Sequence, residues 1–234
     1  MKIAALILPC FTAVLLSSCA SVSVKGEQRA NRQPTQKPSV IYVADFATGQ
    51  GNFKIAGEPG KNPEAFKNKT TETLTAYLVP AISKHVAPAR RASNVGGLPK
   101  SGWVVTGEFT RVNTGSRILR SGVGLGAGGT KMETRVEVYD LAAGTSNGRP
   151  FLTFETTGGS NAMPGLLTNP GTTAVISMTT QAMMGVTDDA ARTSRMITGA
   201  LNSYFIDRGW LAKNKAYSAK RPGKYRLVHE NYTR

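Results

Sequence analysis

The clearest alternation of apolar and polar residues in the chain runs from residue 131 to residue 140. Every second position is apolar or a threonine, and the positions between carry charges. This period of two predicts a strand with one buried face and one solvent face. The expected buried set is Met132, Thr134, Val136 and Val138, and the expected solvent set is Lys131, Glu133, Arg135 and Glu137.

Three other stretches predict strands. Residues 103–111 precede the strand 131–140 and are joined to it by a glycine-rich connector. Residues 151–156 alternate again, and we expect them to pair antiparallel with 131–140 across a turn. Residues 40–46 are almost wholly apolar, which is typical of a central strand covered on both faces.

A helix is predicted to begin at Asn62, because this capping residue is followed by a proline and then by an acid in the first turn. We expect Pro80 to kink or end it. Its apolar face would consist of Leu74, Leu78, Ala81 and Ile82.

Two further helices are predicted near the end of the chain. The first begins at Thr172 or Thr173 and fades at Gly185. The second begins at Thr187, where Asp188 and Asp189 would cap it, and Gly209 ends it. Its expected apolar stripe consists of Ala190, Ser194, Ile197, Leu201, Tyr204 and Phe205.

Together these elements predict an α/β fold. The sheet is expected to be small, mixed and partly antiparallel, with about four strands and with helices packed mainly on one face.

The N-terminal segment predicts a lipoprotein signal peptide. Lys2 is followed by an apolar run over residues 3–16, which is too short for a typical membrane-spanning helix. Leu16-Ser17-Ser18-Cys19 then resembles the bacterial lipobox. The resemblance implies cleavage between Ser18 and Cys19 and lipid attachment, as palmitate for example, at Cys19; the alternative is an ordinary secretory signal with a chance cysteine. Ala20 after the cysteine resembles an outer-membrane address.

These observations divide the chain into four segments. We predict a signal peptide over 1–18, a flexible tether over 19–39, a single α/β domain over 40–210 and a basic, disordered tail over 211–234. The tether and the tail are rich in polar and basic residues without an apolar period.

The charge balance is strongly basic, with 29 Lys and Arg against 14 Asp and Glu, for a formal net charge of +15. A charge of this size favours contact with anionic lipid headgroups, lipopolysaccharide, acidic glycans or nucleic acid, and it is also compatible with a role in solubility alone. Nucleic acid is not expected for an envelope protein.

Few residues suit catalysis or metal binding. Cys10 and Cys19 are the only cysteines, which excludes a disulfide within the domain and a cysteine-based metal site. A hydrolase would have to use Asp45 with His85 or His229, and no Gly-x-Ser-x-Gly motif is present. We therefore expect no catalytic residues, no cofactor and no metal.

The glycine-rich connector over residues 115–130 has three interpretations: a dinucleotide-binding loop, a glycine zipper between helices, and a tight bend that lets another backbone approach. The period-two glycines lead into a strand, which favours the bend. The candidate anion-binding or interface residues in this connector are Arg117, Arg120, Gly122, Gly124, Gly126 and Gly128.

Three strings in this region carry a family resemblance. They are Gly115-Ser-Arg117-Ile-Leu119-Arg120, Val123-Gly-Leu-Gly126-Ala-Gly128 and Val136-Glu-Val-Tyr-Asp140. The chain resembles, over about residues 39–207, the bacterial lipoproteins grouped as domain of unknown function 4410. It is more loosely similar to the lipoproteins of curli-type secretion, but it lacks an obvious pair of long amphipathic membrane strands.

The resemblance implies a small α/β envelope domain on a lipid anchor and brings no catalytic residues. The sequence therefore predicts a non-enzymatic lipoprotein of the bacterial outer membrane, with its domain facing the periplasm. Its expected role is envelope assembly or stability through contacts with an envelope protein or with other copies of itself. The alternative is a module that binds an acidic envelope polymer, peptidoglycan or lipopolysaccharide, through its basic surface.

Overall fold

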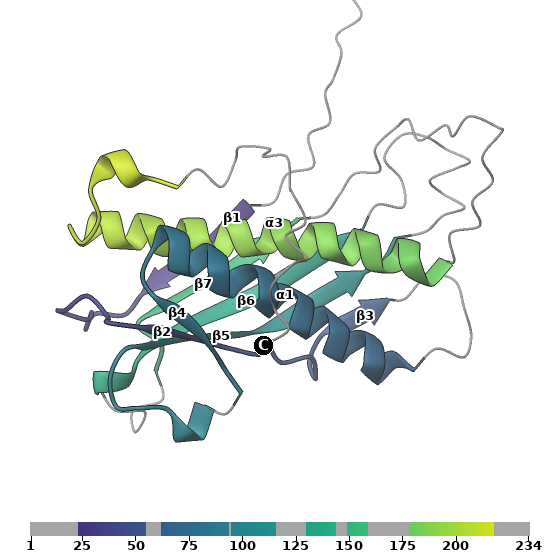
Figure 1. Ribbon diagram of the computed structural model, residues 1–234, viewed down its shortest axis with the longest axis horizontal. Helices are drawn as coiled ribbons and strands as arrows, with labels where there is room; N and C mark the ends of the chain where they lie inside the picture. Colours follow the sequence, from purple (N-terminus) through teal and green to yellow (C-terminus); the bar gives the residue numbers. More distant parts are fainter. Residues whose placement is uncertain are drawn as a thin grey trace, which may run out of the picture.

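A computed structural model describes residues 23–54, 62–93, 95–115, 130–143, 149–158 and 178–217. Within these ranges the chain forms a seven-stranded mixed sheet and two long helices (Figure 1). The strands are β1 Ser23–Arg29, β2 Ile41–Ala44, β3 Asn52–Lys54, β4 Ala89–Ala92, β5 Trp103–Asn113, β6 Lys131–Asp140 and β7 Leu152–Thr157. The helices are α1 Pro63–His85 and α3 Met178–Asp207.

The mixed α/β fold is confirmed, but the predicted number of strands, about four, was too low. The four predicted strands correspond to β2, β5, β6 and β7. The additional strands show no apolar period, because β3 and β4 have only three and four residues and β1 is mostly polar. Backbone pairing with a neighbouring strand creates them, and the sequence of such a segment does not reveal its partner.

The strand order is β1-β7-β6-β5-β2-β4, and β3 also pairs with β5. The strands β5, β6, β7 and β1 pair antiparallel in turn, which confirms the expected pairing of β7 with β6. On the other side of β5, β2 and β3 both run parallel to it, and a bridge at Ala47 joins the same edge between them. The segment 41–54 therefore follows a single edge of β5.

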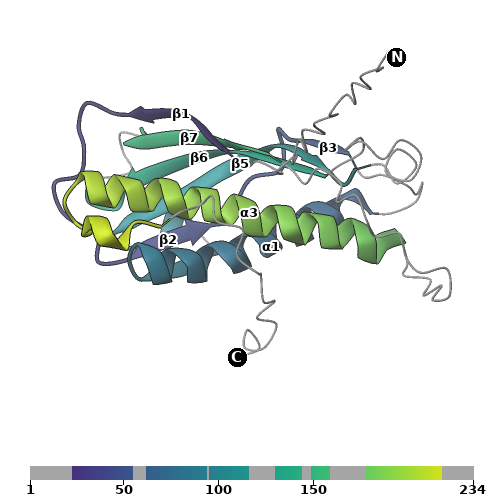
Figure 2. The same cartoon turned by 90° about the horizontal axis from the view of Figure 1, so that it is seen from above.

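Both helices lie on one face of the sheet (Figure 2), as predicted. The predicted buried face of β6 faces them, and its four residues are at most 1% exposed. The core also contains Leu74, Leu78 and Ile82 of α1 and the whole predicted stripe of α3. In the described part of the chain, no helix has the length and apolarity needed to cross a membrane.

The opposite face of the sheet carries a small buried apolar cluster around Val104, and it is polar around Glu108. Glu108, Arg135, Glu155 and Lys25 are cross-strand neighbours on β5, β6, β7 and β1. The Arg135 guanidinium lies 3.2 Å from the carboxylate of Glu108 and 3.4 Å from that of Glu155. Because this row alternates in charge, the open sheet face is nearly neutral and well suited to water.

Helix α1 begins as predicted. The Asn62 side chain accepts hydrogen bonds from the backbone N–H groups of Glu64 and Ala65, at 3.0 and 3.3 Å. Helix α1 does not end at Pro80, because it continues to His85. A proline inside a helix removes one backbone hydrogen bond. The packing of α1 against α3 and the sheet outweighs this loss.

The two predicted C-terminal helices are a single helix of 30 residues, which runs through Gly185. One glycine in a helix costs only about 1 kcal/mol relative to alanine, and the buried stripe that follows it offsets this cost. Asp188 and Asp189 therefore lie inside α3 and do not cap it. Asp189 is 2% exposed and pairs with Arg192 at 3.3 Å, whereas Gly209, with φ +72°, follows the end of the helix as predicted.

Part of the predicted tether belongs to the sheet, because residues 23–29 form the edge strand β1. The side chains of β1 are mostly exposed, so their polar sequence is indistinguishable from that of a linker. The signal peptide and residues 19–22 lie outside the described residues.

Candidate anion-binding surface

One end of the sheet gathers the connections that follow β1, α1, β4, β6 and α3. The strand register places Trp103 beside Asp140, Leu152 beside Arg29 and Ile41 beside Ala89 at this end. Both helices also finish here, α1 at His85 and α3 at Asp207. We call this surface the basic end.

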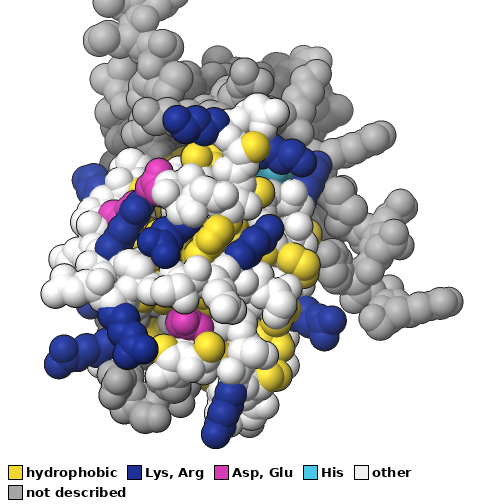
Figure 3. Space-filling model, turned by 90° about the vertical axis from the view of Figure 1, so that its left-hand side faces the viewer, with side chains coloured by type: hydrophobic (Ala, Val, Ile, Leu, Met, Phe, Trp, Pro, Cys, Tyr) yellow, Lys and Arg dark blue, Asp and Glu magenta, His cyan; other side chains and the backbone are white. Residues whose placement is uncertain are grey.

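Most of the excess charge of the described residues lies at the basic end, which faces the viewer in Figure 3. By sequence, the described ranges hold twenty Lys or Arg and twelve Asp or Glu. The acids at the basic end are Glu27, Asp140 and Asp207. The bases there are Arg29, Arg32, Lys37, Lys84, Lys100, Arg149, Arg208, Lys213 and Lys215. Nine of the twenty bases and three of the twelve acids lie here. The rest of the described domain therefore holds eleven bases and nine acids and is close to neutral.

The nine basic side chains are all on exposed residues. Arg29 forms ion pairs, and the Arg208 guanidinium donates to a carbonyl at 2.7 Å. The other seven form no ion pair within the described part of the chain. Their charges are therefore available to an anionic ligand.

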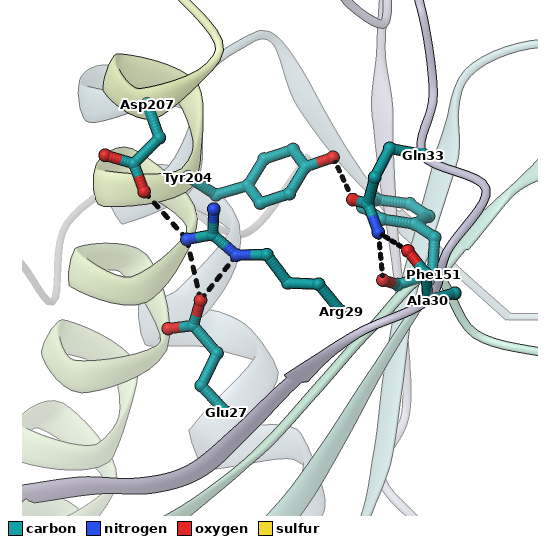
Figure 4. Close-up of polar contacts among 7 residues, drawn as sticks. All are labelled: Glu27, Arg29, Ala30, Gln33, Phe151, Tyr204 and Asp207. Carbon is teal, nitrogen blue, oxygen red and sulfur yellow. Dashed lines mark hydrogen bonds and ion pairs between the residues drawn. The ribbon is translucent and has the colours of Figure 1, made fainter.

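A cluster around Arg29 fixes the segment that follows β1 (Figure 4). Its guanidinium lies 2.7 Å from the carboxylates of both Glu27 and Asp207 and 5.1 Å from the centre of the Tyr204 ring. Burial acts to lower the pKa of Arg29, but hydrogen bonds to Asp207 and Glu27 raise it above its ordinary value. We call this cluster, together with Gln33, the Arg29 clamp.

The other half of the clamp is centred on Gln33. The Tyr204 hydroxyl donates to the Gln33 side-chain oxygen at 2.6 Å, and the Gln33 amide donates to the carbonyls of Ala30 and Phe151. Arg208 adds a hydrogen bond to the Pro34 carbonyl at 2.7 Å. These contacts join the segment after β1 to the last turn of α3, so this part of the basic end has a defined shape.

The chain beyond α3 is also fixed at the basic end. Asn202, which is 1% exposed, donates to the carbonyls of His85 and Lys215 and accepts from the backbone N–H of Tyr217. The His85 and Tyr217 rings lie 4.0 Å apart. Burial, and then the charge of Lys84, lower the pKa of His85. The first residues of the predicted tail, 211–217, therefore lie against the domain, and residues 218–234 lie outside the described part.

The structure does not bring Asp45 and His85 together, and the other candidate histidine, His229, lies outside the described residues. Asp45 accepts hydrogen bonds from Thr75 at 3.0 Å and from Arg91 at 2.6 and 3.0 Å. His85 is ten residues beyond Thr75 on the same helix, which is about 15 Å along its axis. Asp45 therefore joins β2 to α1 and β4. Among the described residues, no three His, Cys, Asp or Glu side chains are placed to hold a metal ion.

The other predicted site residues lie outside the described part of the chain. They are Ser18 and Cys19 of the predicted lipobox and Arg117, Arg120, Gly122, Gly124, Gly126 and Gly128 of the connector. Conversely, the sequence did not indicate the structural roles of Arg29, Gln33 and Asn202. Each of them binds a partner more than a hundred residues away, and no local pattern could have indicated that.

With this geometry in view, comparison with known proteins identifies the family. Residues 41–194 match the family described as Domain of unknown function (DUF4410). The chain belongs to this family. The family resemblance predicted from the glycine strings is thus confirmed, whereas the looser similarity to curli-secretion lipoproteins stays a prediction. No curated protein matches this DUF4410 member.

Two similar solved structures are PelC dodecamers from Paraburkholderia phytofirmans. The first has 12% sequence identity and a TM-score of 0.32, and the alignment covers 73% of this chain and 96% of that chain. The second has 13% identity and a TM-score of 0.29, with 73% and 95% covered. At this level of similarity, no property of PelC is transferred to this DUF4410 member.

Proposed function

We propose that this DUF4410 member is a non-enzymatic, lipid-anchored envelope protein that binds an acidic envelope polymer, peptidoglycan or lipopolysaccharide, through its basic end. The concentration of nine bases and three acids at one end of the domain carries the proposal. A charge spread evenly for solubility would not leave the rest of the described domain nearly neutral.

The anchor would hold the domain close to the outer membrane, on its periplasmic side. Lipid attached at Cys19 would be separated from the first residue of β1, Ser23, by only three residues. Four extended residue steps span at most about 14 Å. The incorporation of β1 into the sheet therefore replaces the long tether predicted from sequence with a short link.

The lipid anchor can be tested in cells of a bacterium that produces the full chain. We expect a labelled fatty acid to be incorporated into the protein, and Cys19→Ser to abolish the label and to release the protein from the membrane fraction. Labelling that survives Cys19→Ser would contradict attachment at this residue.

The polymer-binding proposal can be tested by sedimentation of the mature chain with purified peptidoglycan or with lipopolysaccharide across a salt series. The variant Arg32→Glu/Lys100→Glu reverses two exposed charges at the basic end. The matched control, Lys54→Glu/Lys131→Glu, makes the same charge change at the opposite end of β5, where both residues neighbour Asn113.

We expect salt-sensitive binding to at least one of the two polymers and a loss of about tenfold or more in the basic-end variant, with little change in the control. Equal losses in the two variants would mean that only net charge matters. An absence of binding by the unaltered chain would contradict the proposal.

Envelope assembly through protein contacts, including contacts between copies, is a second candidate function. The open part of the sheet face around Arg135 favours it, because α1 and α3 both lie on the other face. Light scattering on the mature chain tests contacts between copies. A discrete oligomer that Arg135→Glu disrupts would support this candidate, and a monomer at high concentration would contradict self-association.

A further inference from the structure

We infer that Lys84, His85 and Lys215 form an anion subsite within the basic end, and that this subsite binds more tightly when His85 is protonated. The inference rests on the proposed function and deepens it, because it assigns a place on that surface to a single phosphate, sulfate or carboxylate group. Three observations carry it: the contacts that bring the three residues together, the groups around the His85 ring, and the partners of the nearby acids.

The buried side chain of Asn202 joins the end of α1 to the segment that follows α3. Its amide nitrogen donates to the carbonyl of His85 at 2.7 Å and to that of Lys215 at 3.3 Å. Because one nitrogen binds both carbonyls, the backbones of these two residues lie side by side, although they are far apart in the sequence. Lys84 precedes His85 on α1, and both lysines are exposed. Two lysines and a histidine are therefore held in one small area of the basic end.

The surroundings of the His85 ring are basic. Its own helix contributes Lys84, and the segment after α3 contributes Lys213, Lys215 and Tyr217, whose ring centre lies 4.0 Å from that of His85. Helix α3 contributes an uncharged amide. In the described part of the chain no carboxylate acts on the ring, and burial and the charge of Lys84 both lower the pKa of His85. The neutral ring therefore predominates at neutral pH, and protonation adds one positive charge to the lysines.

The acids of the basic end have other partners. Glu27 and Asp207 both lie 2.7 Å from the Arg29 guanidinium, and Asp140 accepts a backbone hydrogen bond in the turn after β6. A cluster of bases without a nearby counter-charge attracts an anion, and an anion beside His85 favours the charged form of its ring. Binding of the anion and binding of the proton therefore strengthen each other to the same extent.

The experiment follows the His85 ring of the mature chain by NMR between about pH 8 and pH 5, with and without sulfate. Sulfate is the probe because its own charge is constant over this range. The ring signal is assigned by its loss in His85→Gln. We expect sulfate to raise the pKa of His85, and the affinity for sulfate to increase roughly five- to tenfold as the pH falls, because protonation adds a positive charge to the subsite.

Two variants locate the effect. Lys84→Gln/Lys215→Gln should abolish the rise in the pKa of His85 and should weaken sulfate binding at pH 5 about tenfold. The matched control Lys54→Gln/Lys131→Gln removes two exposed lysines near Asn113, at the opposite end of β5, and should change neither quantity. Circular dichroism verifies that both variants are folded, and the titration of the unaltered chain tests the subsite without any substitution.

The outcomes separate the two proposals. An unchanged pKa of His85 in sulfate, or an equal rise in Lys84→Gln/Lys215→Gln, would overturn the subsite. Lys84 and His85 would then serve only to complement the C-terminal end of α1, and polymer binding by the rest of the basic end would still stand. A sulfate-dependent rise in the pKa of His85, together with no binding to peptidoglycan or to lipopolysaccharide, would overturn the proposed function and leave a site for small anions.

Discussion

At the scale of single residues, the basic end is organised by a few polar side chains that join distant parts of the chain. Asn202 connects the end of α1, the end of α3 and the segment that follows. Arg29 connects the N-terminal strand to α3. Their partners are known only once the chain has folded, and so neither residue is conspicuous in the sequence.

Asn202→Ala should destabilise the domain by about 2–3 kcal/mol, because it leaves backbone groups of His85, Lys215 and Tyr217 without this partner. Urea unfolding followed by circular dichroism measures the change. The neighbouring exposed Ser203 provides a control, since Ser203→Ala should change the free energy of unfolding by no more than about 0.5 kcal/mol. Equal effects of the two substitutions would contradict the account of Asn202.

His85 should make stability depend on pH. Its pKa is lower in the folded state than its ordinary value of 6.5, so the unfolded chain binds the proton more tightly. The free energy of unfolding should therefore be unaffected by this group above pH 6.5 and should fall as the pH drops below it. His85→Phe, which retains an aromatic ring against Tyr217, should flatten the profile below pH 6.5. An unaltered profile would contradict this.

At the scale of elements, the sequence predicted those whose side chains face a core on one side. The strand β6 and the stripe of α3 from Ala190 to Phe205 have a clear apolar period, and both were identified correctly. The misleading signals were single residues that disfavour a helix. Pro80 and Gly185 disfavour a helix by a few kcal/mol at most, and burial of α1 and α3 against the sheet exceeds this.

Pro80→Ala tests this balance directly. It restores a backbone N–H inside α1, so we expect a gain of about 1–2 kcal/mol in the free energy of unfolding, measured in urea. The gain should be smaller than the full cost of a helical proline, because alanine also increases the entropy of the unfolded chain. A loss of stability would show that α1 requires the proline at this position.

Polar edge strands were the second class of failure. The strand β1 has only two half-buried side chains, at Ser23 and Val24, and the rest are exposed. Its place beside β7 depends on backbone pairing and on the Arg29 clamp, and neither leaves a pattern in residues 23–29. The consequence is functional, because this strand shortens the link to the predicted lipid anchor.

At the scale of the whole molecule, net charge was apparent from composition, but its location was not. The basic residues are spread along the sequence and form no stripe there, and the topology then brings five connections to one end of the sheet. The same topology leaves the open sheet face balanced in charge. The composition gives the number of charges, whereas the structure shows where on the domain they lie.

Hydrogen exchange of the mature chain, with and without soluble peptidoglycan fragments or lipopolysaccharide, tests the central claim most directly. The account predicts that the polymer that binds slows amide exchange in the connections at the basic end, residues 30–40, 86–88 and 208–217. It predicts no change on β5 and β6 around Glu108 and Arg135. Slowed exchange confined to the open sheet face, with an unchanged basic end, would contradict the account.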